Sequence, residues 1–138
     1  MSRIPEVAAA LVCQVLVTDL MTQSKTLANV FGVLQTPILP MLTSVGLYVK
    51  MVDGEGQYAL RIRFVRLRDD RTVLELPVQQ VAWANPLDPL EIGVNFQQVP
   101  IEEEGMHEFQ IYIDDVYVGR SPFSVKKFSP PNQTGGKL

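Results

Sequence analysis

Residues that carry catalytic or metal chemistry are scarce in this chain of 138 residues, which has one cysteine, one histidine and one tryptophan. A single cysteine cannot form an intramolecular disulfide, and this favours a reducing compartment such as the cytoplasm. A structural zinc site needs several Cys or His ligands at close spacing, so it is excluded. We therefore expect no metal and no other cofactor.

Long apolar runs and a strong charge of either sign are also missing. No run reaches the roughly 18 to 20 apolar residues that would span a bilayer, and Pro5 and Glu6 interrupt the basic start that a signal peptide would need. The net charge is only −3, which gives no large basic field for nucleic acid. We expect a soluble, cytoplasmic protein that binds neither a membrane nor nucleic acid.

Proline and glycine, in contrast, are spread throughout the chain, with 10 prolines and 9 glycines between short apolar runs. This spacing suits many turns better than a few long helices. The length and the 46% hydrophobic content predict one ordinary domain with a single core. We assign residues 1–128 to this domain and residues 129–138 to a flexible C-terminal tail, because SPPNQTGGKL has nothing to bury.

The clearest structural pattern is the stretch from Val45 to Leu67. Two alternating runs flank the break at Asp53-Gly54-Glu55-Gly56, which predicts a β-hairpin closed by a short Gly-containing loop. Each run has one apolar face that we expect to line the core. These faces consist of Leu47, Val49 and Met51 in the first run and Tyr58, Leu60, Ile62 and Phe64 in the second.

Other short runs show the same strand character. A helix is an alternative for residues 7–20, where Ala8 to Ala10 favour one, but the β-branched residues that follow favour a strand. Pro37 and Pro40 predict a crossing between two sheets. About eight short strands predict an all-β fold, an antiparallel β-sandwich of the immunoglobulin-like or another Greek-key kind, with a small barrel as the alternative.

The runs Val7 to Thr18 and Leu27 to Gln35 are predicted to pair as a first hairpin that is apolar on both faces. One face holds Cys13, Val15, Phe31 and Val33, and a single core cannot also receive the other face. Either a loop covers that second face or another subunit docks there. The candidate partner interface on it consists of Val12, Leu16, Val30 and Leu34.

Arg61 and Arg63 form a second candidate binding surface. They share one strand face within a cluster of arginines that extends to Arg71. Guanidinium groups in this arrangement can pair with an acidic partner or with carboxylates across the sheet. An ordinary solvated outer face is the alternative.

No catalytic set can be assembled from the pattern. His107 is the only histidine and lies at a predicted strand entry, while Cys13 lies inside an apolar strand, where a thiol is usually inert. Predicted turns hold several carboxylates, but none has the D-x-D-x-D-G spacing of a calcium loop. We predict a protein that is not an enzyme and has no catalytic, cofactor-binding or metal-binding residues.

Three segments carry a resemblance to a known family: ALVCQVLVTDLMTQSKTLANVFGVL (residues 10–34), VKMVDGEGQYALRIRFV (49–65) and EGMHEFQIYIDDVYVGRSPFSV (104–125). Over residues 7–127 the chain resembles a bacterial family of small all-β proteins catalogued only as a domain of unknown function. This chain has Gln14 and Gln23-Ser24 where the family pattern often has an acidic residue and a glycine. The resemblance implies a bacterial β-sandwich and assigns no activity.

The leading hypothesis is a non-enzymatic interaction or structural module, a subunit of a bacterial homo-oligomer or of a larger assembly, whose partner is a protein or a second copy. The alternative is a small-ligand or carbohydrate-binding module that uses Trp83, Tyr48 and Tyr117 as stacking platforms. A hydrolase that uses His107 is the third hypothesis.

Overall fold

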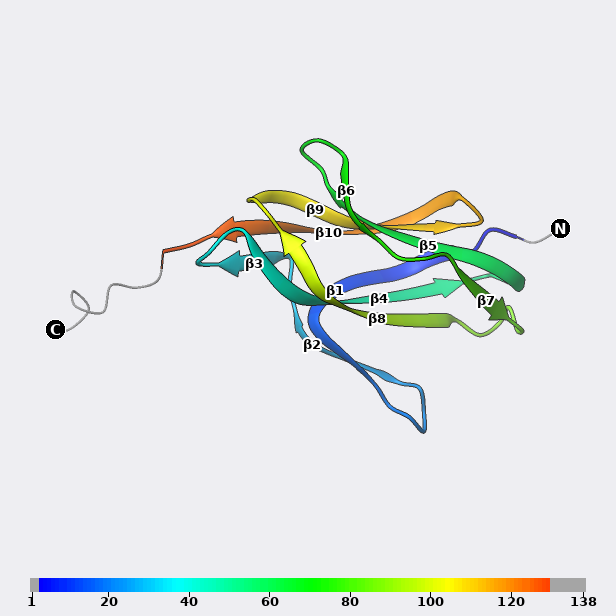
Figure 1. The fold of residues 1–138 in the computed structure, drawn as a ribbon. Coiled ribbons are helices and arrows are strands. Elements are labelled where there is room, and N and C mark those ends of the chain that lie inside the picture. The colour runs from blue at the N-terminus through cyan, green and yellow to red at the C-terminus, as the bar shows by residue number, and fades with distance from the viewer. Residues whose placement is uncertain (1–2, 130–138) are drawn as a thin grey trace.

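The computed structural model describes residues 3–129, which form two β-sheets packed face to face (Figure 1). The predicted tail lies outside this range apart from Ser129. Residues 3–129 include no helix long and apolar enough to cross a membrane. The ten strands are β1 (Glu6–Thr18), β2 (Lys25–Val30), β3 (Val33–Thr36), β4 (Met41–Val52), β5 (Gly56–Arg66), β6 (Arg71–Glu75), β7 (Gln79–Trp83), β8 (Leu90–Ile101), β9 (Gly105–Ile113) and β10 (Val116–Lys127).

The strand order gives the fold. One sheet has the order β2-β1-β4-β8, and the other has the order β3-β10-β9-β5-β6, with β7 also paired to β5. Every pair is antiparallel except β3 with β10. Strands β4, β5, β8, β9 and β10 follow the sheet assignment of strands B, C, E, F and G of an immunoglobulin domain. The predicted antiparallel, immunoglobulin-like sandwich is therefore confirmed.

A single core lies between the two sheets. Alternate residues of each central strand point inward, and these include the predicted core faces of β4 and β5, all at most 4% exposed. Four phenylalanines pack at the centre, with ring centroids 4.8–6.4 Å apart. They are Phe64, Phe96, Phe109 and Phe123.

The predicted hairpin between Val45 and Leu67 is wrong in its pairing. Strands β4 and β5 lie in different sheets, and residues 53–55 carry the chain across the sandwich instead of closing a hairpin. Alternation shows which side chains of a strand share a face, but it does not show which strand lies beside it. An arch between facing sheets therefore has the same sequence pattern as a hairpin.

Hydrogen bonds to the Tyr58 hydroxyl and packing of Gly54 against Trp83 hold this crossing in place. The Tyr58 hydroxyl donates to the carbonyl of Glu55 (2.9 Å) and accepts from the amide of Glu55 (2.8 Å). Gly54 lies flat on the Trp83 ring, where an added Cβ would come within 2.4 Å of Cε3. Only a residue without a side chain fits this approach.

The first strand leaves the sandwich part of the way along its length. From Glu6 to Cys13 it pairs with β4, and from Cys13 to Thr18 it pairs with β2, which beyond Cys13 is its one strand partner. Beyond Cys13, the side chain of Asn95 on β8 takes the place of a neighbouring strand. Its Oδ1 accepts from the Leu16 amide (3.0 Å) and its Nδ2 donates to the Leu16 carbonyl (2.7 Å).

Two glycines make room for this bend. An added Cβ on Gly46 would lie 2.8 Å from the Cys13 Sγ, and one on Gly93 would lie 2.5 Å from Leu16 Cδ2. Any side chain at either position would push β1 away from the outer face of β4 and β8. The bend therefore depends on Gly46, Gly93 and Asn95 together.

Gly54→Ala should destabilise the domain by ~1–3 kcal/mol, because the new methyl group overpacks the Trp83 ring. Gly32→Ala is the matched control, since no atom lies within 4 Å of its added Cβ. Urea denaturation measures both. Equal stability of the two variants would contradict the described packing at the crossing.

Asn95→Ala should loosen β1 beyond Cys13, because Leu16 loses both hydrogen bonds to the Asn95 side chain. We expect amides 15–18 to exchange with deuterium at least ~10-fold faster while β5 and β9 exchange at the native rate. Gln97→Ala, two residues along the same strand, is the control. Unchanged exchange in the Asn95 variant would show that this side chain does not hold the bend.

Candidate functional site

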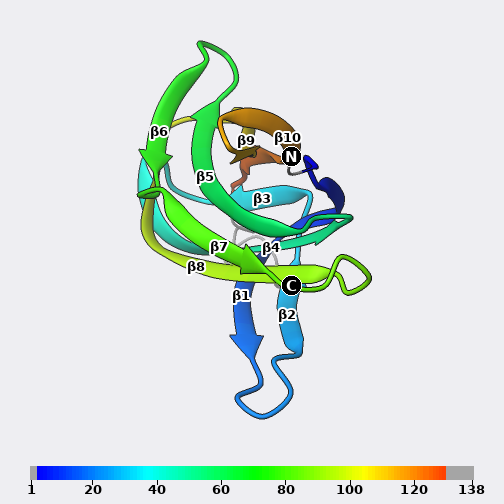
Figure 2. The ribbon, with the colours of Figure 1, turned by 90° about the vertical axis from the view of Figure 1, so that its right-hand side faces the viewer.

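The segment from Gln14 to Val30, here called the arm, stands off the sandwich. It contains the end of β1 and the whole of β2, which pair antiparallel as the predicted first hairpin, although residues 33–35 of the predicted second run belong to β3 in the other sheet. Figures 1 and 2 show it projecting from the outer side of the β1-β4-β8 sheet, away from the second sheet. A two-stranded hairpin in water is marginally stable by itself, so a surface that covers the arm would stabilise it.

The arm exposes large apolar side chains on one face and at its tip. On the face, Val15 is 45% and Val17 is 56% exposed, opposite Ala28 and Thr26 on β2. At the tip, Leu20 is 89% and Met21 is 92% exposed. Single exposed apolar residues are common, but a continuous group of them marks a contact surface.

The tip has a defined conformation. The Asp19 carboxylate accepts hydrogen bonds from the backbone amides of Met21 (2.8 Å) and Thr22 (2.9 Å). These bonds lower the pKa of Asp19 from its ordinary value, so the carboxylate is ionised at neutral pH. Leu20 and Met21 are thereby presented to solvent by an ordered turn.

A shallow hollow, here called the root hollow, lies where the arm leaves the body. It consists of two adjoining depressions of about 380 and 260 Å³ that share Leu42, a residue that is 66% exposed. Val15 of the arm face lines the first depression, so the arm face and the hollow form one continuous surface. The lining residues are Gln14, Val15, Pro40, Met41, Leu42, Thr43, Ser44, Gln98, Pro100 and Glu102.

The structure separates the four apolar residues of the predicted partner interface. Val12 (2% exposed) and Leu34 (8%) belong to the core, and Leu16 (4%) is covered at the bend. Only Val30, at 53%, is exposed. The prediction assumed one flat hairpin, whereas β1 bends after Cys13 and Leu34 lies on β3 of the other sheet.

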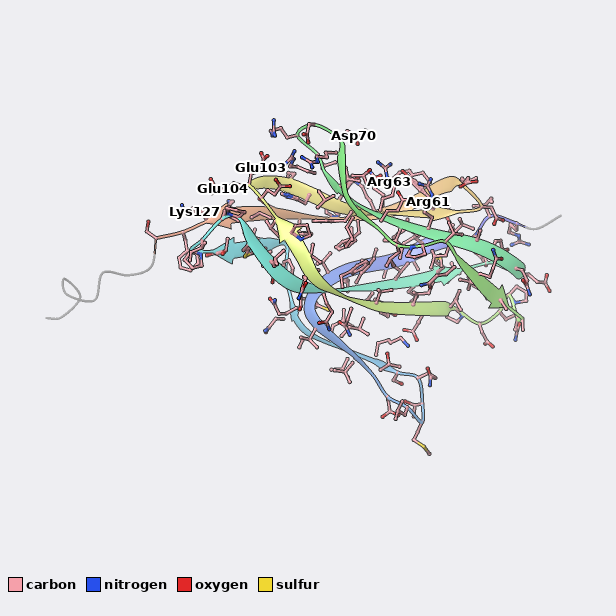
Figure 3. The ribbon with its side chains drawn as sticks, in the orientation of Figure 1. Arg61, Arg63, Asp70, Glu103, Glu104 and Lys127 are labelled. Atoms are coloured by element: carbon pink, nitrogen blue, oxygen red, sulfur yellow. The ribbon has the colours of Figure 1, made fainter. Side chains whose placement is uncertain are left out.

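Arg61 and Arg63 lie on the outer side of the second sheet, across the sandwich from the arm (Figure 3). The Arg61 guanidinium stacks over Tyr112 at 4.2 Å and approaches the carboxylate of Glu75 at 3.8 Å. Arg63 donates to Tyr112 (3.2 Å) and to the hydroxyl of Thr72. These contacts of Arg61 and Arg63 are thus with residues of the same sheet.

The two residues considered for nucleophilic chemistry are both buried and lie in different sheets. Cys13 is fully buried, and burial raises the pKa of its thiol. His107 is 2% exposed and packs against the rings of Phe64 and Phe123, and burial lowers its pKa. Neither group is open to a substrate in this structure.

The proposed stacking platforms do not come together. Trp83 is 5% exposed, and its Nε1 donates to the carbonyls of Asn85 and Asp88. Tyr48 lies on the outer face of the first sheet, where burial and a hydrogen bond with Glu91 raise its pKa to about 12. Tyr117 lies on β10 of the second sheet. The three rings therefore form no shared binding face.

Two carboxylates of the acidic turn between β8 and β9 make contacts within the chain. Glu103 pairs with Arg66 (2.9 Å) and Arg68 (2.7 Å), and Glu104 accepts from the backbone amide of Lys127 (2.7 Å). Among residues 3–129, no group of three His, Cys, Asp or Glu side chains is arranged to hold a metal ion.

The sequence did not single out Leu20 and Met21, which are 89% and 92% exposed. The available signal was their position, because two adjacent large apolar residues immediately precede the polar turn at Thr22 to Lys25. A turn that only connects strands is usually polar.

The chain was compared with known proteins. A search of the curated proteins finds no match. Among solved structures, it is similar to an immunoglobulin-like protein from Pseudomonas aeruginosa, with 12% identity, a TM-score of 0.43, and coverage of 90% of this chain and 98% of that one. The model of a family of unknown function, DUF6941, matches residues 8–126. The chain therefore belongs to the DUF6941 family, in agreement with the resemblance to a family of unknown function over residues 7–127.

Proposed function

We propose that this protein is a non-enzymatic interaction module, a structural subunit of a bacterial homo-oligomer or larger assembly, and that the arm is its contact surface. One observation carries the proposal: Leu20 and Met21 are 89% and 92% exposed on a segment that the sandwich does not need for its core. Water-exposed side chains of this kind gain free energy when a partner covers them.

The way the arm is held supports this function. Asn95 bonds both backbone groups of Leu16, and Asp19 orders the tip, so the apolar surface is presented in one shape. A surface that is ordered before binding loses less conformational entropy on association. An immunoglobulin-like sandwich is a common scaffold for such display, although the fold alone assigns no function.

The paired variant Leu20→Asp with Met21→Asp tests the contact surface. Both side chains are exposed, so the free energy of unfolding should change by no more than ~0.5 kcal/mol, while association should be lost because carboxylates would be buried at the contact. Leu87→Asp is the matched control, since Leu87 is also 89% exposed and lies in the β7–β8 connection.

The wild-type chain and the two variants serve as baits in affinity purification from a lysate of the source bacterium. Each partner obtained is then purified and tested in a binding assay with all three chains. Partners that bind the wild-type and Leu87 variant chains should fail to bind the double variant. Equal binding by all three chains would show that the arm is not the contact surface. A wild-type chain that binds neither another protein nor itself would overturn the proposed function.

A further inference from the structure

We infer that His107 is a pH-sensitive switch: its neutral ring keeps one end of the sandwich closed, and protonation of the ring opens that end. This part of the molecule, here called the β8–β9 end, consists of residues 102–108 and of residues 123–127 of β10, which lie beside the start of β9. The inference goes beyond the proposed function and does not depend on it. It is supported by the burial of the ring, by the charges around it and by the hydrogen bonds of the residues next to it.

The His107 ring lies in the core, where a positive charge is unfavourable. It is 2% exposed and stacks on the rings of Phe64 and Phe123, at centroid distances of 5.6 and 5.9 Å. Its Nδ1 donates to the carbonyl of Gly105 (3.0 Å), a bond that a neutral imidazole can make. Protonation would place a charge where water is excluded, so this site favours the neutral ring.

The charged groups closest to the ring are already paired with each other. Arg66 lies opposite His107 on β5 and is 6% exposed, and its guanidinium disfavours a second positive charge. Glu103 favours protonation of His107, but it pairs with Arg66 (2.9 Å) and Arg68 (2.7 Å). Asp69 also pairs with Arg66 (2.7 Å). An imidazolium would therefore have to compete with two arginines for its counter-ion.

The other strands around the ring do not supply a counter-ion. On β10, the buried residues on either side of Phe123 are Ser121 and Val125. The buried side chains of β3, β4 and β8 include no charged group. Glu108, the next residue on β9, points to the outer face of the sheet and pairs there with Arg120 (3.1 Å).

The residues beside His107 make the hydrogen bonds that close the β8–β9 end. The carbonyl of Met106 accepts from the amide of Leu67 (3.0 Å), and the Glu104 carboxylate accepts from the amide of Lys127 (2.7 Å). Figure 3 shows Glu104 and Lys127 close together where β10 ends. Because these bonds join the β8–β9 turn to the ends of β5 and β10, moving His107 out of the core would release them together.

The direction of the pH dependence follows from the burial of the ring. Burial lowers the pKa of His107 in the folded chain below its ordinary value of 6.5, which the unfolded chain retains. The stability that the neutral ring contributes is therefore present above about pH 6.5 and is lost as the pH falls through the folded-state pKa. Asp69 and Glu103 stay ionised over this range, since hydrogen bonds from arginines hold the pKa of Asp69 at about 2 and lower that of Glu103.

Urea denaturation at about pH 7.5 and about pH 5 tests whether His107 causes the acid sensitivity. The unfolding equilibrium constant of the wild-type chain should rise ~5- to 30-fold at the lower pH, where ~30-fold is the limit set by an unfolded-state pKa of ~6.5. His107→Phe keeps a ring in the core but binds no proton, so its constant should change by no more than ~3-fold. His107→Gln is a second variant without a titrating ring. An equal rise in the wild-type chain and in both variants would overturn the inference.

Hydrogen exchange at the same two pH values locates the opening. After correction for the intrinsic pH dependence of exchange, amides 105–108 and 123–127 should lose protection at least ~5-fold more than amides 45–51 of β4, the internal control. The same amides of His107→Phe should keep their protection. Uniform loss of protection along the wild-type chain would show global unfolding and overturn the switch at the β8–β9 end.

An NMR titration of the untagged wild-type chain measures the ring directly, because His107 is the only histidine. The ring of the folded chain should remain neutral at about pH 6, and a midpoint at its ordinary value of ~6.5 would overturn the inference. Neither outcome bears on the proposed function, since the arm and its exposed tip do not include this residue.

Discussion

The pair of hydrogen bonds between the Asn95 side chain and the backbone of Leu16 is the interaction on which the exposed surface depends. At Cys13 the first strand loses β4 as a neighbour, and its next backbone groups would otherwise face water. One amide on β8 satisfies both groups at Leu16, while Gly46 and Gly93 allow the backbone to approach. The strand can therefore leave the sandwich in a fixed direction.

This arrangement separates the buried core from the exposed apolar surface. The sandwich buries one continuous core, including the single histidine, and its outer arginines are paired within their own sheet. The arm adds little to that core and carries Leu20 and Met21, which are almost fully exposed. Substitutions at its tip should therefore affect association without affecting folding, whereas substitutions at Val12 or Leu34 should affect folding itself.

The sequence predicted the fold class, the strand faces and the pairing of the first hairpin, because period-two alternation reports directly which side chains are buried together. It did not predict the neighbours of each strand. The arch between β4 and β5 has the alternation of a hairpin, and the bend in β1 comes from Asn95, which lies 79 residues from Leu16 in the chain. For that reason the pattern indicates an apolar excess in the first hairpin but places Val12, Leu16 and Leu34 on an outer face. All three side chains are buried in the structure.

Methionine oxidation by hydroxyl radicals, measured from dilute to concentrated protein, tests the central claim most directly, because two other methionines serve as internal references for Met21. Met21 is 92% exposed at the tip, Met106 is 46% exposed on the second sheet and Met51 is buried. The account predicts that Met21 oxidises fastest in dilute solution and becomes protected as the chain associates, while Met106 and Met51 keep their rates. A Met21 that is as slow as Met51 when dilute, or that keeps its rate on association, would contradict it.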